Sequence, residues 1–131
     1  MKKKRSHHLN YPPLYDKALE ILTMSRHMSY LFCEDLIGPE THGPEDDKIY
    51  FTGDIVQQSY NLAPEILRAE EQAYSEDKRR YAKRLKVLTK SLFYTCDRLE
   101  NSPIKSKEFL PLFRKELRHF RKLQRTWAMM L

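Results

Sequence analysis

Basic side chains that repeat at helical spacing are the clearest candidates in this sequence for binding a ligand. They run through FRKELRHFRKLQRTW, from Phe113 to Trp127. Arginine dominates the set, and its rigid guanidinium meets phosphate oxygens through two parallel hydrogen bonds. These cations form a ridge about 100° around the helix from the apolar positions. No glutamate occupies an i,i+4 position that would neutralise the ridge, so the sequence predicts that it binds a polyanion. The ridge consists of Lys107, Arg114, Arg118, Arg121 and Arg125.

A second line of cations lies on the preceding expected helix, at Arg79, Lys83, Lys86 and Lys90. These four fall almost opposite the apolar stripe of that helix, where any water-soluble helix keeps its charges. A solvated surface is therefore the plainer interpretation of this line. Contact with nucleic acid, in support of the arginine ridge, is the sharper one.

Charge is distributed very unevenly along the chain. The net charge is +6, but residues 77–131 carry 16 basic and 5 acidic side chains, whereas residues 34–54 sum to −6. Positive charge clustered in this way favours RNA or DNA as the partner. An ordinary solubility surface, an acidic protein and the acidic loop of a neighbouring subunit remain alternatives for the same residues.

Catalytic and metal-binding patterns find little support. The sequence contains no HExxH motif and no Ser-His-Asp or Cys-His set that helical periodicity would bring together. Glu116 and His119 form a single Glu-x-x-His pair, whereas di-iron bundles need two. We therefore expect no enzyme activity, no cofactor and no metal, and a bundle enzyme using this pair is the least favoured hypothesis. Signatures of RNP, KH and zinc-finger modules are missing, so binding should depend on phosphate and on salt.

Helical periodicity organises the chain into one domain. We expect a flexible basic arm over residues 1–12 and a bundle domain over 13–131, with an acidic loop at 38–53 that crosses over or faces a partner. Pro64 should kink the second helix because proline has no N–H to donate. The fold class is all-α, an antiparallel four-helix bundle. The four helices are expected at 13–37, 54–74, 77–100 and 107–131.

Apolar residues at three- and four-residue spacing predict the core. The first two helices each carry a second apolar line about 100° from the first, which leaves surface for another subunit. These second lines are Tyr15, Leu22, Cys33 and Ile37, and Val56, Tyr60, Ala63, Leu67 and Tyr74. The main lines are Leu14, Ala18, Ile21, Met28, Phe32 and Leu36; Ile55, Leu62, Ile66 and Ala73; Tyr81, Leu85, Leu88, Leu92, Cys96 and Leu99; and Phe109, Phe113, Leu117, Phe120 and Trp127.

The cellular setting is inferred from what the sequence lacks. No apolar run approaches the roughly 20 residues of a membrane span, and no apolar segment follows the basic start as in a secretory signal. The two cysteines, Cys33 and Cys96, lie in helical patterns near apolar positions, which is typical of buried free thiols. We therefore expect a soluble, cytoplasmic protein with no membrane partner.

The stretch ILRAEEQAYSEDKRRYAKRLKVLTKSLFYTCDRL, together with the basic helix that ends in RTWAMML, resembles the accessory variability determinant (Avd)-like group of bacterial four-helix bundles. Those proteins are relatives of proteins encoded in 23S rRNA intervening sequences. The likeness covers about residues 53–131. It lies in a helix that ends in a short AYSEDK turn and resumes with regularly spaced leucines.

This resemblance implies a non-enzymatic basic bundle that forms a ring-like homo-oligomer, with a pentamer as one candidate. It also implies a reverse transcriptase and its template RNA as partners, as in diversity-generating retroelements. Our leading hypothesis is thus an accessory protein that binds RNA or DNA through Arg114, Arg118, Arg121 and Arg125, helped by Arg79, Lys83, Lys86 and Lys90. The alternative is a scaffold or adaptor that docks an acidic protein without nucleic acid.

Overall fold

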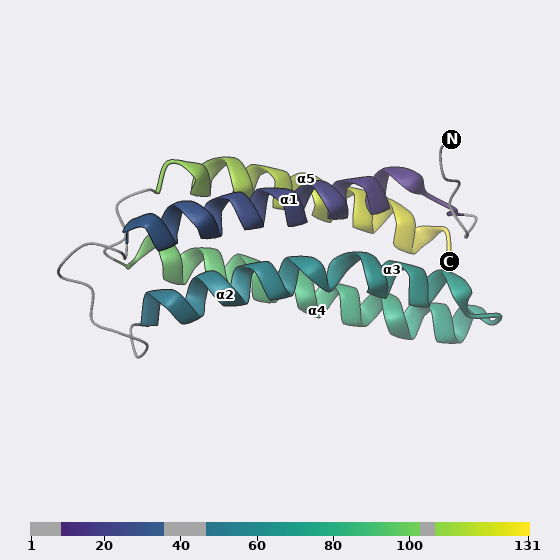
Figure 1. Ribbon diagram of the computed structural model, residues 1–131. Helices are drawn as coiled ribbons and strands as arrows, with labels where there is room; N and C mark the ends of the chain where they lie inside the picture. Colours follow the sequence, from purple (N-terminus) through teal and green to yellow (C-terminus); the bar gives the residue numbers. More distant parts are fainter. Residues whose placement is uncertain (1–8, 36–46, 103–106) are drawn as a thin grey trace, which may run out of the picture.

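The computed structural model describes residues 9–35, 47–102 and 107–131, and every regular element within them is an α-helix. Helices α2 and α3 follow one another almost in line, so the five segments make four rods of a helical bundle (Figure 1). The all-α prediction is confirmed for the described residues. The segments are α1 (Pro12–Asp35), α2 (Asp47–Tyr60), α3 (Leu62–Glu71), α4 (Ser75–Glu100) and α5 (Phe109–Met129).

The second rod is interrupted near Pro64, as predicted. Pro64 has no N–H to offer the carbonyl of Tyr60, and the helix breaks at Asn61 before it resumes as α3. Hydrogen bonds on either side keep the two halves in register, from Asn61 N to Gln57 O at 3.2 Å and from Glu65 N to Asn61 O at 3.4 Å. The single helix expected over 54–74 is therefore two helices.

Several predicted boundaries were wrong. Helix α2 begins at Asp47, so residues 47–53 of the expected acidic loop are helical, while 38–46 lie outside the described residues. Helix α4 begins at Ser75, before the expected start at residue 77, and the residue that precedes it is Tyr74.

The core contains most of the predicted apolar lines. Tyr81, Leu88 and Phe109 pack against the core but are only partly buried. Ala73 and Tyr74 are exposed, contrary to prediction, because α3 ends at Glu71. Leu36 and Ile37, and the side chain of Cys33, lie outside the described residues. The predicted residues that are buried are Leu14, Ala18, Ile21, Met28, Phe32, Ile55, Leu62, Ala63, Ile66, Leu85, Leu92, Cys96, Leu99, Phe113, Leu117, Phe120 and Trp127.

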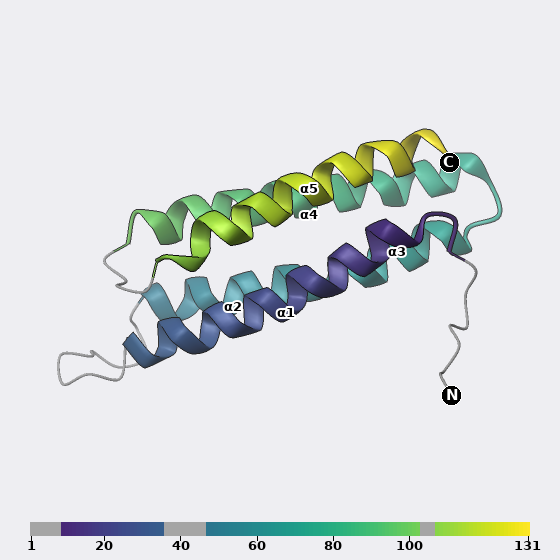
Figure 2. The same ribbon diagram turned by 90° about the horizontal axis from the view of Figure 1, so that it is seen from above.

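The rods are arranged so that α4 and α5 form one side of the bundle and α1 with α2 and α3 form the other (Figure 2). The start of α1, the end of α5 and the turn between α3 and α4 lie at the same end (Figure 1). No helix in the described segments has the length and apolar character needed to cross a bilayer.

Glu70 ties this end of the bundle together. Its Oε1 accepts a hydrogen bond from the backbone N–H of Asn10 at 2.9 Å, and its Oε2 accepts one from the indole N–H of Trp127 at 2.8 Å. The backbone oxygen of Glu70 also accepts a hydrogen bond from Lys78 Nζ at 3.3 Å. Asn10, expected in a flexible arm, is therefore fixed to α3, while residues 1–8 lie outside the described part of the chain.

Candidate nucleic-acid interface

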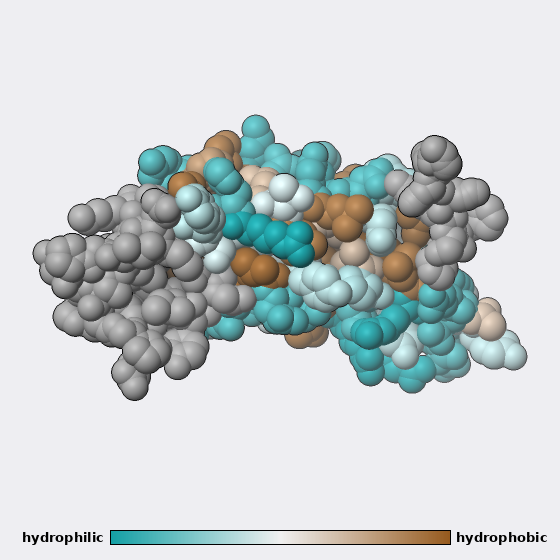
Figure 3. All heavy atoms as spheres, viewed as in Figure 1, coloured by the Kyte–Doolittle hydropathy of each residue, from teal (hydrophilic) through white to brown (hydrophobic). Residues whose placement is uncertain are grey.

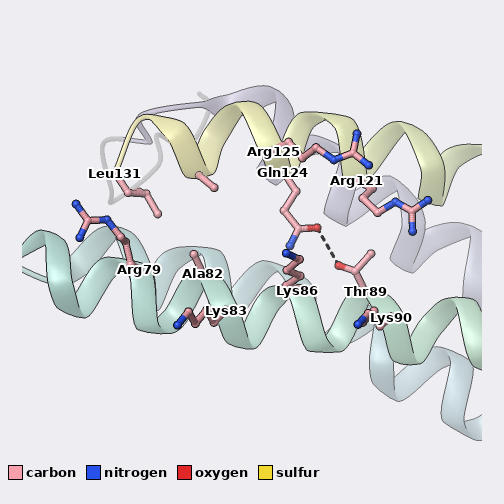
Figure 4. A pocket seen from close by; sticks show the side chains of 11 residues that line it. Arg79, Ala82, Lys83, Lys86, Thr89, Lys90, Arg121, Gln124, Arg125 and Leu131 are labelled. Carbon is pink, nitrogen blue, oxygen red and sulfur yellow. Dashed lines mark hydrogen bonds between the residues drawn. The ribbon is translucent and has the colours of Figure 1, made fainter.

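A groove of about 530 Å³ opens between the first half of α4 and the second half of α5 (Figure 4). Six cations line it, all of them exposed, and no acidic residue does. None of the six forms an ion pair within the described segments. They are Arg79, Lys83, Lys86, Lys90, Arg121 and Arg125.

Helical spacing and small side chains create this groove. The four α4 cations repeat at intervals of four, three and four residues, so they share one face of the helix. Arg121 and Arg125 are also four residues apart on α5. Between the two rows lie Ala82 of α4 and Ala128 of α5, which are too short to fill the space between neighbouring helices. Helix axes normally pack about 8–10 Å apart, and short side chains leave the outer part of that interface hollow.

The floor of the groove carries a polar contact. Thr89 donates its hydroxyl hydrogen to Gln124 Oε1 at 3.1 Å and to its own helix at Leu85 O at 2.9 Å. Both side chains are buried, Gln124 with 6% of its surface exposed. Figure 4 shows the amide of Gln124 extended from α5 toward α4, with its oxygen on the Thr89 side. The two helices are thus joined at the base of the cationic walls.

Arg121 is held in a defined orientation. Its guanidinium carbon lies 4.5 Å from the centroid of the Phe93 ring, a cation–π contact between α5 and α4. Stacking of this kind fixes the plane of the guanidinium and restricts its rotamers. Arg121 is nevertheless exposed, so its charge stays available to a ligand.

Arg114 has a different role from the one the sequence predicted. Its guanidinium lies 3.0 Å from Asp97 and 2.9 Å from Glu100, both on the second half of α4. Burial opposes the charged form of Arg114, but the hydrogen bond to Asp97 and the nearby charges raise its pKa. Spacing along α5 alone predicts no acidic partner for Arg114, whereas its two partners come from the neighbouring helix α4. Arg114 is an ion-paired residue outside the groove.

The rest of the predicted α5 ridge also divides. Lys107 Nζ donates to the backbone oxygen of Glu100 at 2.9 Å. Arg118 is exposed and does not line the groove. Only Arg121 and Arg125 of the five ridge residues face the α4 cations. The structure therefore brings two of the five ridge residues together with all four α4 cations, although a solvated surface is the plainer interpretation of the α4 line from sequence.

Thr89 and Gln124 were missed as candidate site residues. Gln124 falls in line with Phe113, Leu117, Phe120 and Trp127, at a position that periodicity assigns to the core. A polar side chain at such a position must find a hydrogen-bonding partner or a ligand. That mismatch between residue type and position is the signal that could have identified the floor of the groove.

The opposite side of the bundle is apolar where the groove side is cationic. Apolar atoms are visible along the seam between α1 and α2–α3 (Figure 3). Helical spacing puts Tyr15, Leu19 and Leu22 on one side of α1, and the apolar residues Val56 and Leu67 recur on α2 and α3; these five residues are called here the apolar face. Leu19 has 41% of its surface exposed and the other four are half-buried. The α1 and α2–α3 second lines predicted from the sequence are thus partly accessible.

Glu116, one of the two residues of the bundle-enzyme hypothesis, is engaged in a contact with another helix. Glu116 Oε1 accepts a hydrogen bond from Lys17 Nζ at 2.6 Å, and this contact lowers the pKa of Glu116. His119 is exposed. Within the described segments no group of three or more His, Cys, Asp or Glu side chains could hold a metal ion. Burial raises the pKa of Cys96 to about 12, so this thiol stays protonated at neutral pH and is a poor nucleophile.

Comparison with known proteins does not identify the chain. No family model, no curated protein and no solved structure matches it. The resemblance to the Avd-like group therefore stays a prediction. What the groove binds is inferred from its own residues.

Proposed function

We propose that this protein is a non-enzymatic accessory bundle that binds RNA or DNA phosphates in the groove between α4 and α5. The observation that carries the proposal is the gathering of six cations in one concave site; within the described residues they form no ion pair and no acidic side chain lines the site. Like charges held together repel one another, so such a site is unfavourable until an anion occupies it. A polyanion neutralises several of them at once and releases its own counterions.

The mixture of cations fits a phosphate backbone. Arg79, Arg121 and Arg125 offer bidentate donors, whereas the three lysines act as flexible point charges. An acidic protein would meet the same charges, but its carboxylates are spaced along a peptide and carry less charge per unit length than a nucleic acid. The adaptor hypothesis therefore becomes an outcome of the test below.

We propose further that the bundle is antiparallel and assembles into a ring-like homo-oligomer through the apolar face. Partly exposed apolar side chains that continue along a seam are typical of surfaces that meet another protein. A reverse transcriptase as the partner is proposed from the resemblance alone. The turn at 72–74 between α3 and α4 supports an antiparallel arrangement of these two rods, because it is too short to cross the length of the bundle.

The test is a salt titration of binding to a structured RNA. A groove variant carries Lys86→Gln, Arg121→Gln and Arg125→Gln. A matched control carries Arg26→Gln, Lys115→Gln and Lys122→Gln, three exposed cations that do not line the groove. Both variants lose three positive charges, so they differ only in where the charge is removed.

We expect the groove variant to bind on the order of 100-fold more weakly, with a salt slope reduced by about three, because each lost cation is one lost phosphate contact. The control should stay within a few-fold of wild type. Equal losses in both variants would mean that net charge alone drives binding and would contradict the groove. If polyglutamate competes as well as RNA does, the adaptor hypothesis is favoured instead.

A further inference from the structure

The walls and the floor of the groove present different chemistry to a ligand. The walls are cationic, whereas the floor is neutral and consists of the Thr89–Gln124 contact together with Ala82 of α4 and Ala128 of α5. Its volume of about 530 Å³ lies within the roughly 300–1,000 Å³ of clefts that bind small molecules. The cationic walls can bind the phosphates of a ligand, whereas the neutral floor is suited to an uncharged part of the same ligand.

The amide of Gln124 offers a hydrogen-bonding end to that part. One end of the amide contacts Thr89, and the nitrogen at the other end has no hydrogen-bond partner within the described part of the chain. Gln124 lines the groove although only 6% of its surface is exposed. This nitrogen is accessible from the groove, so a ligand with an acceptor oxygen or nitrogen can take a hydrogen bond from it in place of water.

Arg121 offers a flat surface beside it. One side of the guanidinium rests on Phe93 at 4.5 Å, and exposure of the residue leaves the other side open. Guanidinium planes stack on nucleobases as well as on aromatic side chains. Arg121 and Gln124 are three residues apart on α5, so both side chains leave the helix on the groove side.

Together these features distinguish between forms of nucleic acid. In a duplex the faces of the bases are stacked inside, so a duplex reaches the groove with its phosphates and leaves the floor empty. A single strand exposes the face and the hydrogen-bonding edge of each base. We propose that the groove takes single-stranded nucleic acid, with one base stacked on Arg121 and hydrogen-bonded to Gln124, and flanking phosphates on the cationic walls. This inference rests on the proposed function and sharpens it.

The experiment compares two probes and three variants. The probes are a fluorescein-labelled oligouridine of about ten nucleotides and a blunt DNA duplex of the same length, each titrated at low salt. Gln124→Met keeps the length of the side chain, and Thr89 keeps its hydrogen bond to Leu85 O. Arg121→Lys keeps the charge but loses the planar group. Arg118→Lys, outside the groove, is the control for that exchange.

We expect Gln124→Met to weaken oligouridine binding about three- to tenfold, and Arg121→Lys about tenfold, with duplex binding changed less than about twofold. Arg118→Lys should leave both probes unchanged. Thermal unfolding by circular dichroism confirms that each variant is folded.

Two results would overturn the inference while the proposed function stands. In one, wild type binds both probes alike and Gln124→Met changes neither. In the other, each groove variant weakens both probes equally, which would indicate a general loss of charge contacts. If wild type binds neither probe at low salt, the proposed function fails together with the inference.

Discussion

The α4–α5 side of the bundle gathers six cations around one groove, whereas the α1–α2–α3 side exposes apolar side chains along a seam. Each arrangement is unfavourable in the isolated chain, the first through repulsion and the second through contact of apolar surface with water. They call for different partners, because a polyanion relieves the first and another protein surface relieves the second. The comparison suggests two separate surfaces on one small bundle.

The largest effect is expected from charge reversal in the groove. Lys86→Glu with Arg125→Glu should reduce RNA binding by more than about 100-fold, because two attractive contacts become repulsive. The oligomeric state, measured by sedimentation velocity, should not change if the two sides are independent. Loss of assembly in this variant would show that the groove is itself a subunit contact.

The reciprocal change tests the apolar face. Leu19→Arg places a charge among partly exposed apolar side chains and should weaken self-association about tenfold or more, since an unpaired charge is desolvated at the contact. RNA affinity per subunit should stay within a few-fold. Leu112→Arg is the matched control, because Leu112 is 52% exposed on α5 and lies outside the apolar face. Equal effects of the two substitutions on self-association would contradict the assignment of the apolar face.

A smaller effect, on stability and not on binding, is expected for Arg114, the ion-paired residue of the α5 ridge. Arg114→Gln should lower the free energy of unfolding by about 1 kcal/mol, because Asp97 and Glu100 lose their shared cation and the pair is partly solvated. Binding of RNA should change less than about twofold. Urea unfolding and the salt titration measure the two quantities. A binding loss as large as that of Arg121→Gln would return Arg114 to the interface.

The smallest effect concerns the contact that links the two sides, between Lys17 of α1 and Glu116 of α5. The hydrogen bond from Lys17 lowers the pKa of Glu116 in the folded state. Its stabilisation is therefore fully present above the unfolded pKa of about 4.3 and is lost as pH falls through the lower folded value. Glu116→Gln should lower stability by about 0.5 kcal/mol at pH 7. Urea unfolding at about pH 3 should give variant and wild type nearly equal stability, and a difference that persists there would contradict the ion pair.

Much of the fold could be predicted from periodicity. The apolar lines through Leu14, Leu85 and Phe113 follow from spacing alone, because burial of one stripe dominates helix packing. The kink near Pro64 follows from a missing N–H. The start of α2 at Asp47 could not be predicted, because glycines and acids around it are typical of loops. Local propensity is a weak guide to where a helix begins.

The candidate site was predictable in its residue types and not in its assembly. Sequence spacing placed Arg121 and Arg125 on one ridge and the four α4 cations on another. It could not show that the ridges face each other across a groove, nor that Gln124 completes its floor. Those relations depend on the rotation of α4 against α5, which no pattern within a single helix contains.

The sequence by itself determined that the protein is helical, where its apolar stripes run and which helix faces are cationic, because each of these depends only on residue type and the 3.6-residue period. The tertiary structure alone decided which cations are neutralised. Asp97 and Glu100 lie near the end of α4, whereas the groove cations lie between Arg79 and Lys90, and α5 runs along both regions. Arg114 therefore meets Asp97 and Glu100, while Arg121 and Arg125 meet other cations. Coulomb interactions act across space at a few ångströms, so a charge is paired or left free by its neighbours in the fold and not by its neighbours in the chain.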